Sequence, residues 1–122
     1  MSKKKILIVE DDADVMRGLM IRLRANGYDT VAAGDGYAAT KSAKDEQPDL
    51  VLLDLGLPAG DGYIVMERLK TILSNVSTPV VVLSAKDPRS NKKRALEAGA
   101  VAFLQKPADN DELMATIRKA LE

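Results

Sequence analysis

The chain of 122 residues contains no cysteine and no histidine. Without cysteine it has no disulfides, thiolate metal sites or thiol nucleophiles, and without histidine it has no imidazole ligands, imidazole bases or phosphohistidine. Aromatic residues make up only 3% of the chain, with one Phe and no Trp. Any chemistry must therefore use carboxylates, hydroxyls, lysine or a bound cation.

The chain also lacks an excess of charge, because 18 basic residues balance 18 acidic ones. This balance gives no indication of a partner that binds through bulk charge, and the basic cluster at 92–94 is expected to be solvated surface. The apolar runs are far shorter than a membrane span, and the basic start at 3–5 is not followed by a signal-peptide core. We expect a soluble, cytoplasmic protein with a single domain over residues 1–122.

Short apolar runs rich in β-branched residues recur at 6–9, 50–53, 80–83 and 101–104, with a weaker one at 28–33. Such continuous apolarity is typical of strands buried on both faces. Segments with helical spacing follow at 13–26, 37–45, 62–73, 89–98 and 110–121. Five strand and helix units predict an α/β fold, a doubly wound (βα)5 three-layer sandwich with a five-stranded parallel sheet. The flavodoxin-like order 2-1-3-4-5 places strands 1 and 3 side by side.

Capping residues support these boundaries. Asp87 followed by Pro88 predicts the start of a helix, and Gly99 predicts its end. Asp109 with Glu112 three residues later predicts another start, as a capping box with Asp in place of Ser or Thr.

Polar residues follow the apolar runs at what would be the carboxyl edge of the sheet. Glu10 and Asp11 follow the first run, and Asp54 follows the third. Ser84 and Lys106 follow the fourth and fifth runs. Three acids brought together repel one another, so their proximity makes physical sense mainly around a hard cation. The acids therefore predict a Mg²⁺ site, with Mn²⁺ as an alternative, and Lys106 places a positive charge opposite the metal.

Each polar residue also has a purely structural interpretation. Acids after strands often cap helices, and Asp12 or Asp14 could do only that. Ser84 could be a turn hydroxyl and Lys106 an ordinary surface residue. Asp54 fits this interpretation less well, because an acid directly after a buried strand is desolvated unless it is paired. The conjunction at four strand ends favours a functional site.

Several short motifs lie along the chain in a fixed order: ILIVEDD at 6–12, DLGLP at 54–58 followed by DG at 61–62, LSA at 83–85, EAGA at 97–100 and KP at 106–107. Each is weak alone, but their order and spacing together are specific. With them the chain resembles a response-regulator receiver domain of two-component signalling, the CheY-like fold, over essentially its whole length.

The resemblance implies roles for the acidic residues. Asp54 would accept a phosphoryl group from a kinase phosphohistidine and form an aspartyl phosphate. Asp11 and Asp54 would ligate Mg²⁺ directly, and Glu10 would act on the metal through water. Gly56 would offer its backbone carbonyl to the metal.

The resemblance also implies how a signal leaves the site. Ser84 would donate a hydrogen bond to the phosphoryl oxygens, and Lys106 would pair with them. As the Ser84 hydroxyl moves, the ring of Phe103 would turn inward and reshape the face of the fourth helix, fifth strand and fifth helix. Phe103 is as well explained as a plain core aromatic. The Lys106–Pro107 peptide bond is expected to be cis.

Some positions depart from the commonest family pattern. Glu10 stands where Asp is frequent, and Phe103 stands where Tyr would add a hydroxyl. Gly56 has no side chain, and Lys86 is basic two residues after Ser84. In the family, the positions of Gly56 and Lys86 influence how water reaches the acyl phosphate, so the lifetime of the phosphorylated state is left open.

The implied partners are a sensor histidine kinase or phosphotransfer protein upstream, and an effector protein or a fused output domain downstream. The domain itself is not expected to contact nucleic acid or membrane, and a homodimer on activation is an open possibility. It would not be an enzyme with a separate substrate, because its catalysis is limited to its own phosphotransfer and autodephosphorylation.

Three other functions compete with this interpretation. A flavin-binding electron carrier could share the strand order, but the acids after the first strand would repel an unchelated phosphate. A Mg²⁺-dependent phosphatase with an Asp nucleophile usually has a second acid two residues later, where this chain has Gly56. A receiver that no longer takes up phosphate and acts only in docking or dimerisation would fail to bind Mg²⁺.

Overall fold

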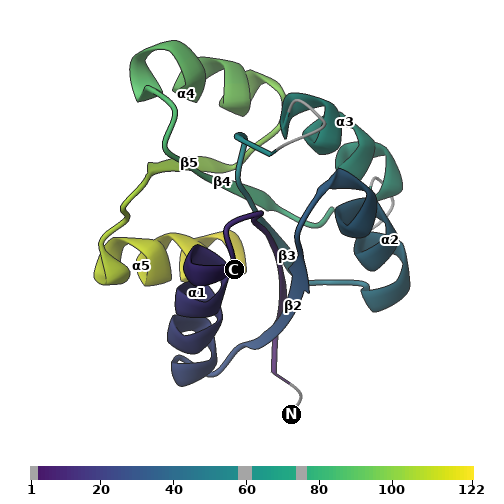
Figure 1. The fold of residues 1–122 in the computed structure, drawn as a ribbon, viewed down its shortest axis with the longest axis vertical. Helices are drawn as coiled ribbons and strands as arrows, with labels where there is room; N and C mark the ends of the chain where they lie inside the picture. The colour runs from purple at the N-terminus through teal and green to yellow at the C-terminus, as the bar shows by residue number, and fades with distance from the viewer. Residues whose placement is uncertain (1–2, 58–61, 74–76) are drawn as a thin grey trace.

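Five strands alternate with five helices in the computed structural model, which describes residues 3–57, 62–73 and 77–122 (Figure 1). The strands are β1 (Lys5–Val9), β2 (Asp29–Ala33), β3 (Leu50–Leu53), β4 (Val80–Ser84) and β5 (Ala102–Gln105). The helices are α1 (Ala13–Ala25), α2 (Gly36–Glu46), α3 (Gly62–Ile72), α4 (Pro88–Glu97) and α5 (Asn110–Ala120). The predicted alternation is confirmed.

All strands are parallel and lie in the order β2-β1-β3-β4-β5, as the flavodoxin-like prediction requires. In the register of β1 with β3, Val9 lies opposite Leu53. The strands β1 and β3 therefore end level with each other at the carboxyl edge of the sheet. Glu10 and Asp54, which directly follow them, begin at the same level.

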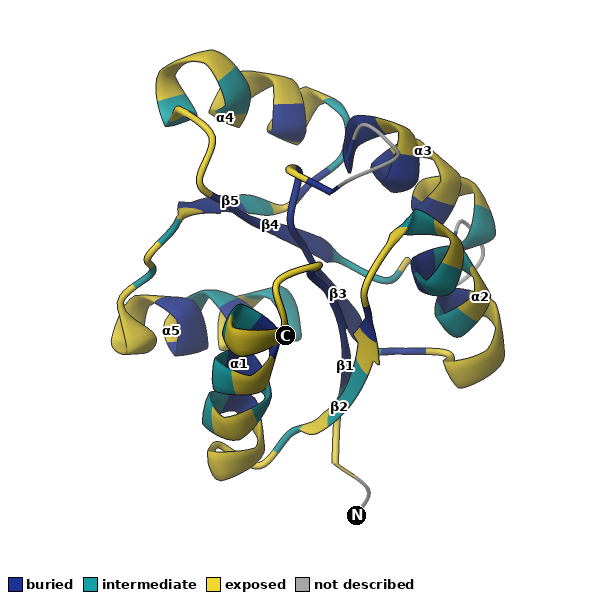
Figure 2. Ribbon diagram, viewed as in Figure 1, coloured by how far each residue is buried: buried dark blue, intermediate teal, exposed yellow. Residues whose placement is uncertain are grey.

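Helices cover both faces of the sheet, with α1 and α5 on one side and α2, α3 and α4 on the other (Figure 1). The side chains of β1 alternate between the two layers: Ile6 and Ile8 join the core under α1 and α5, while Leu7 and Val9 join the core on the opposite side. Figure 2 shows β1, β3 and β4 as the buried centre of the molecule, while β2 at the edge of the sheet is largely exposed or half-buried. Burial on both faces explains why the strand sequences are continuously apolar.

Local capping sets the helix boundaries as expected. The Asp87 carboxylate accepts the N–H of Arg89 at 2.9 Å, and Pro88 is the first helical residue of α4. Asp109 accepts the N–H of Glu112 at 3.1 Å and caps α5. Gly99 follows α4 with a φ of +112°, a left-handed conformation that favours glycine.

Most predicted boundaries shift by one residue in the structure, and two of these shifts concern β5 and α4. β5 begins at Ala102 rather than at 101, and Val101, which precedes it, is 54% exposed. The fourth helix begins one residue earlier than its spacing predicts, at Pro88. Two motif residues, Pro58 and Asp61, lie outside the described residues. Within the described part of the chain, no helix has the length and apolarity needed to span a membrane.

Candidate functional site

The carboxyl ends of β1 and β3 bring Glu10 and Asp54 together. The N–H of Asp54 donates to the carbonyl of Val9 at 3.0 Å, and the N–H of Glu10 donates to Ala33 of β2 at 3.0 Å. The sheet hydrogen bonds thus continue one residue beyond each strand. This rigid placement explains how two acids are held side by side with exposures of only 4% and 8%.

Three carboxylates form one acidic cluster at this edge of the sheet. Glu10, Asp11 and Asp54 each offer an oxygen within 4.8 Å of the others, and Asp11 is exposed. The structure therefore assembles the three acids that the sequence predicts as metal ligands. Like charges at this spacing raise each other's free energy unless cations compensate them, so the cluster favours a cation.

Lys106 is the positive charge inside the cluster. Its ammonium donates to Glu10 and lies 3.4 Å from Asp54 Oδ2. The backbone N–H of Lys106 donates to the carbonyl of Ser84 at 2.9 Å, which fixes the start of the loop after β5. The peptide bond between Lys106 and Pro107 is cis, as the family resemblance implies.

The surroundings of Lys106 keep it charged. Burial alone lowers the pKa of the ammonium, but the hydrogen bond to Glu10 and the charge of Asp54 outweigh it and raise the pKa above the ordinary 10.5. Lys106 thus remains a cation at neutral pH. Its one positive charge faces three carboxylates, so a divalent cation would balance the charge that remains.

Gly56 and Ser84 are two further residues that the sequence predicts for the site. The N–H of Gly56 donates to Asp54 Oδ1 at 3.1 Å, which holds the carboxylate from the loop that follows β3. Ser84 is fully buried at the end of β4, and its hydroxyl oxygen accepts the N–H of Lys86 at 3.1 Å. The bond uses a lone pair of the oxygen, so the hydroxyl still has a proton to donate.

Phe103 is buried in β5 with 8% of its surface exposed. It belongs to the same core cluster as Leu55 and Tyr63, which follow β3 in the chain, and as Ala95 of α4. In this structure the ring therefore lies inside the core. The movement that would bring the ring there stays a prediction.

Asp12 has the purely structural role of a helix cap, which the sequence offers as one interpretation of this acid. Its carboxylate accepts the N–H groups of Asp14 and Val15 at 2.9 and 3.0 Å and caps α1. The N–H of Asp12 in turn donates to Glu10 Oε2 at 3.0 Å. The cap therefore also orients one of the acids of the cluster.

Two residues next to the site were not assigned a role from sequence. A Cβ at Gly62 would lie 2.4 Å from the Cα of Leu55, so the start of α3 packs directly on the residue after Asp54. Tyr63 follows with its ring in the core and its hydroxyl bonded to Asn91 of α4 at 2.9 Å. The DG motif signals the glycine. A buried Tyr hydroxyl usually has a hydrogen-bond partner, but the sequence does not show which residue it is.

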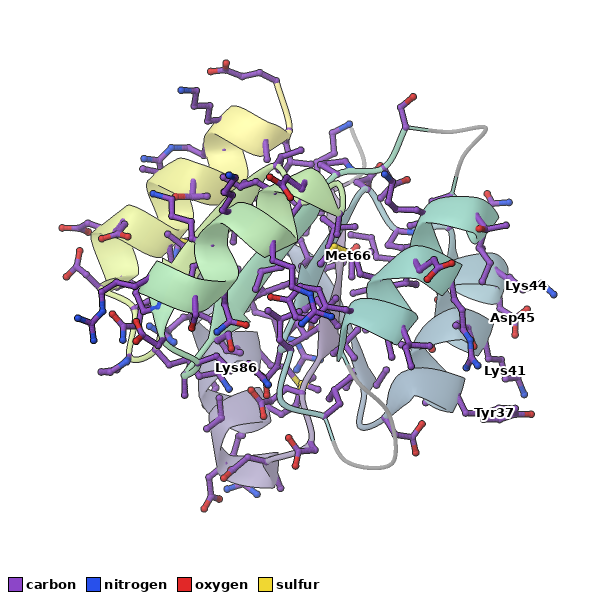
Figure 3. All side chains as sticks on the ribbon, turned by 90° about the horizontal axis from the view of Figure 1, so that it is seen from above. Tyr37, Lys41, Lys44, Asp45, Met66 and Lys86 are labelled. Carbon is purple, nitrogen blue, oxygen red and sulfur yellow. The ribbon has the colours of Figure 1, made fainter. Side chains whose placement is uncertain are left out.

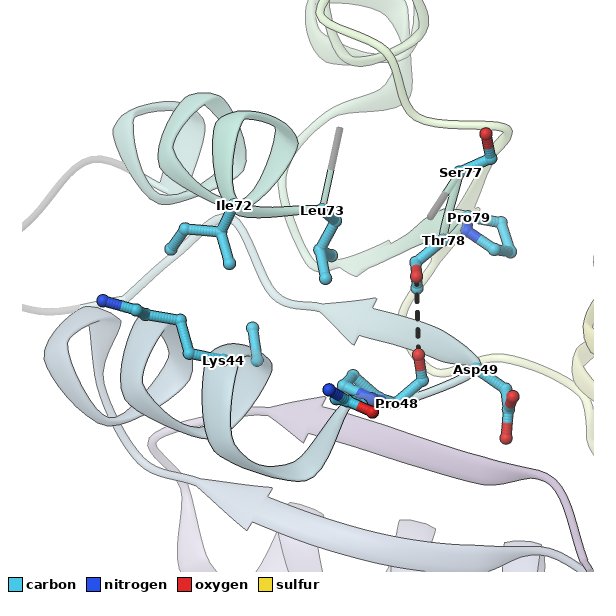
Figure 4. A pocket seen from close by; sticks show the side chains of 10 residues that line it. Lys44, Pro48, Asp49, Ile72, Leu73, Ser77, Thr78 and Pro79 are labelled. Carbon is cyan, nitrogen blue, oxygen red and sulfur yellow. Dashed lines mark hydrogen bonds between the residues drawn. The ribbon is translucent and has the colours of Figure 1, made fainter. Parts of the chain in front are cut away.

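A cavity of about 590 Å³ lies at the opposite, amino-terminal edge of the sheet (Figure 4). Lys44 and Asp49 border it, and Thr78 donates to the carbonyl of Pro48 at 3.4 Å across its rim. None of the predicted site residues lines this cavity. The chemistry-bearing residues gather instead at the carboxyl edge, where open α/β folds bind their ligands.

Comparison with known proteins decides the family. A family model described as the response regulator receiver domain matches residues 6–118. The chain belongs to this family. Its members are the signalling switches of two-component systems, so the motifs predicted the family, the fold and the class of function correctly. Membership favours the receiver over the flavin carrier and the phosphatase.

The receiver domain is similar in sequence to half of several longer regulators. It is 39% identical over 116 residues to the transcriptional regulatory protein KdpE of Mycobacterium tuberculosis, covering 95% of this chain and 50% of that protein. It is 37% identical to the alkaline phosphatase synthesis transcriptional regulatory protein PhoP of Bacillus subtilis, with 97% and 48% covered. The chain spans about half the length of these curated relatives.

Two solved receiver domains match it over nearly their whole length. The BeF₃-activated N-terminal receiver domain of Klebsiella pneumoniae RstA superposes with a TM-score of 0.89 at 32% identity, covering 98% of this chain and 99% of that one. A CheY-like receiver domain protein from Methanospirillum hungatei gives a TM-score of 0.91 at 26% identity, with 98% and 94% covered.

Proposed function

We propose that this receiver domain is switched by phosphorylation of Asp54. The observation that carries the proposal is the pairing of a nearly buried acid with a lysine inside a cluster of carboxylates. Such a carboxylate is held in one orientation by Gly56 and Lys106 and can act as a nucleophile toward phosphorus. Residues 1–122 act in this proposal as one domain.

Mg²⁺ fits the donor set of this site. The carboxylates of Glu10, Asp11 and Asp54 supply hard oxygen atoms within 4.8 Å of one another, and Gly56 supplies a backbone carbonyl in the adjoining loop. Mn²⁺ takes similar ligands. When bound, the ion would offset negative charge on the transferring phosphoryl group.

The residues of the chain do the remaining work of the transfer. An oxygen of Asp54 attacks the phosphorus of the donor, and the new O–P bond replaces the P–N bond to the donor histidine, whose ring nitrogen keeps the electron pair. Lys106 places its charge beside the attacking carboxylate. The hydroxyl of Ser84 donates its proton as a hydrogen bond to a phosphoryl oxygen. The domain catalyses only this step and its own dephosphorylation.

The donor is a sensor histidine kinase or a phosphotransfer protein. A groove of about 480 Å³ beside Lys106 supports this partner, because apolar side chains of α1 and of the loop after β5 line it. Val15, Leu19 and Pro107 are among them. A helix of the donor that docks here would bring its phosphohistidine to the edge of the sheet.

The output is a fused domain or a separate effector protein. The relatives named above are transcriptional regulators about twice as long as this chain, which supports a fused domain that acts on transcription. The receiver would control it through the face of α4, β5 and α5, with Phe103 as the switch, and without touching nucleic acid itself. Dimerisation through this face and a cytoplasmic location remain predictions.

Intact mass after incubation with acetyl phosphate tests the proposal. We expect the gain of one phosphoryl group in Mg²⁺ and none in chelator, with the modification mapped to Asp54. The Asp54→Asn variant should keep its fold, by circular dichroism, and gain no mass. A wild-type chain that gains no mass and binds no Mg²⁺ would identify a receiver that acts only in docking, and labelling of Asp54→Asn would place the acceptor elsewhere.

A further inference from the structure

Tyr63 joins the first turn of α3 to α4. Its hydroxyl donates to Asn91 Oδ1 at 2.9 Å and lies 3.3 Å from the carbonyl of the same residue. The guanidinium carbon of Arg94 lies 3.7 Å from the centre of the Tyr63 ring, within the range of a cation–π interaction. Two consecutive turns of α4 therefore contact this single side chain.

The contact matters because α4 has little apolar surface of its own against the core. Ala95 is the single buried residue of this helix, whereas α3 buries five. All four basic residues of α4 are exposed, namely Arg89, Lys92, Lys93 and Arg94. A helix held by so little burial depends on its polar contacts for its position, and the link to Tyr63 is a substantial one among them.

The residue before Tyr63, Gly62, contacts the segment that directly follows Asp54. Gly62 donates its N–H to the carbonyl of Leu55 at 3.2 Å, and its Cα packs so closely on Leu55 that no side chain fits between them. Leu55 directly follows Asp54, whose Oδ1 accepts the N–H of Gly56. A phosphoryl group on Asp54 removes charge from this carboxylate and weakens that bond, so the disturbed backbone is the same one that holds α3.

We propose that Tyr63 is a positioning residue that couples the segment after Asp54 to α4, by a route separate from Ser84 and Phe103. The trigger in this inference rests on the proposed phosphorylation of Asp54. The contacts of Tyr63 with Asn91 and Arg94, which we call the junction, are present in the unphosphorylated chain and can be tested there.

The first experiment measures the junction in the unphosphorylated chain. Tyr63→Phe removes the hydroxyl but keeps the ring under Arg94. Tyr37→Phe is the matched control, because Tyr37 is 79% exposed and projects outward from α2 (Figure 3). Hydrogen exchange of the α4 amides should be about fivefold faster in Tyr63→Phe, the effect of one lost hydrogen bond, and unchanged in the control.

A double-mutant cycle assigns this effect to the contact. Asn91→Ala also removes a bond from the Asn91 amide to the carbonyl of Asp87, so the single variant is not sufficient. If Tyr63 acts through Asn91, Tyr63→Phe adds little to the exchange rate of Asn91→Ala. Additive effects, or equally faster exchange in β4 and α5, would overturn a local junction in favour of general destabilisation.

The second experiment follows the signal. In Tyr63→Phe treated with acetyl phosphate and Mg²⁺, intact mass should show wild-type phosphorylation, while amide shifts in α4 become smaller and the Phe103 ring signals change as in the wild type. A full α4 response would overturn the coupling role. Failure of the wild-type chain to gain a phosphoryl group would instead overturn the proposed function, and with it the trigger, while the exchange experiment would still decide the junction.

Discussion

Gly62 allows the start of α3 to contact the backbone of Leu55, the residue after Asp54. Ala at this position would place its Cβ 2.4 Å from the Cα and 2.5 Å from the carbonyl oxygen of Leu55, and neither atom can move without moving the chain. We expect Gly62→Ala to lower the free energy of unfolding by about 1–3 kcal/mol, as overpacking does in other cores. Chemical denaturation measures this change.

Gly18 provides the matched control for that substitution. It lies inside α1, and a Cβ added there meets nothing within 4 Å. Gly18→Ala should raise the free energy of unfolding by about 0.5–1 kcal/mol, because Ala has the higher helix propensity. Similar changes in both variants would contradict a steric role for the Gly62 contact.

The ammonium of Lys106 makes the free energy of unfolding depend on pH in the alkaline range. Its pKa is above 10.5 in the folded chain, since Glu10 and Asp54 outweigh the effect of burial, and is close to 10.5 when unfolded. A raised pKa means that the stabilisation is complete below pH 10.5 and is lost as pH rises through the folded value. Urea denaturation in chelator should show wild type losing stability over this range relative to Lys106→Met.

Lys106→Met is the appropriate comparison because other lysines and tyrosines titrate in the same range and remain in both chains. The difference between the two unfolding free energies isolates the one ammonium. A difference that stays constant above pH 10.5 would show that the lysine is not stabilised by its acids. At neutral pH, Lys106→Ala should weaken the response of α4 and β5 more than it weakens Mg²⁺ binding.

At the scale of the helix, neighbouring acids have different tasks at the start of α1. Asp12 caps the helix, whereas Asp11 lies exposed in the acidic cluster. Asp12→Ala should lower the free energy of unfolding by about 1 kcal/mol and leave the Mg²⁺ dependence of phosphorylation unchanged. Asp12→Ser retains a capping oxygen and should restore stability.

Asp11→Ala should give the opposite result, with little loss of stability in chelator and a higher Mg²⁺ requirement for phosphorylation. Titration of the phosphorylation yield with Mg²⁺ and denaturation in chelator together separate the two acids. A raised Mg²⁺ requirement in Asp12→Ala would contradict the division of tasks between them.

The helices and strands were predictable because their signals are local. Strands buried on both faces require continuous apolar runs, and caps such as Asp87 and Asp109 bond to N–H groups only two or three residues away. The acids were predictable as a group because parallel strands end at one edge of a sheet. The contact of Tyr63 with Asn91 was not predictable from sequence, since it joins residues 28 apart through side chains on different helices.

At the scale of the whole molecule, the acidic cluster costs folding free energy when no cation is bound, because three carboxylates must come together against one lysine. The unfolded chain has no such cluster and binds Mg²⁺ weakly, so Mg²⁺ should raise the melting temperature. A free concentration 100 times the dissociation constant corresponds to about 2.7 kcal/mol. Calorimetry at constant ionic strength measures the rise.

Asp11→Asn distinguishes the site from general screening by salt. This variant should be at least as stable as wild type in chelator, because one repulsive charge is gone, but it should gain little from Mg²⁺. Asp45→Asn removes an acid that projects from α2 on the outer surface (Figure 3) and should respond to Mg²⁺ like wild type. An equal rise in all three chains would show that Mg²⁺ stabilises the fold without occupying the cluster, since only specific binding to the native state depends on Asp11.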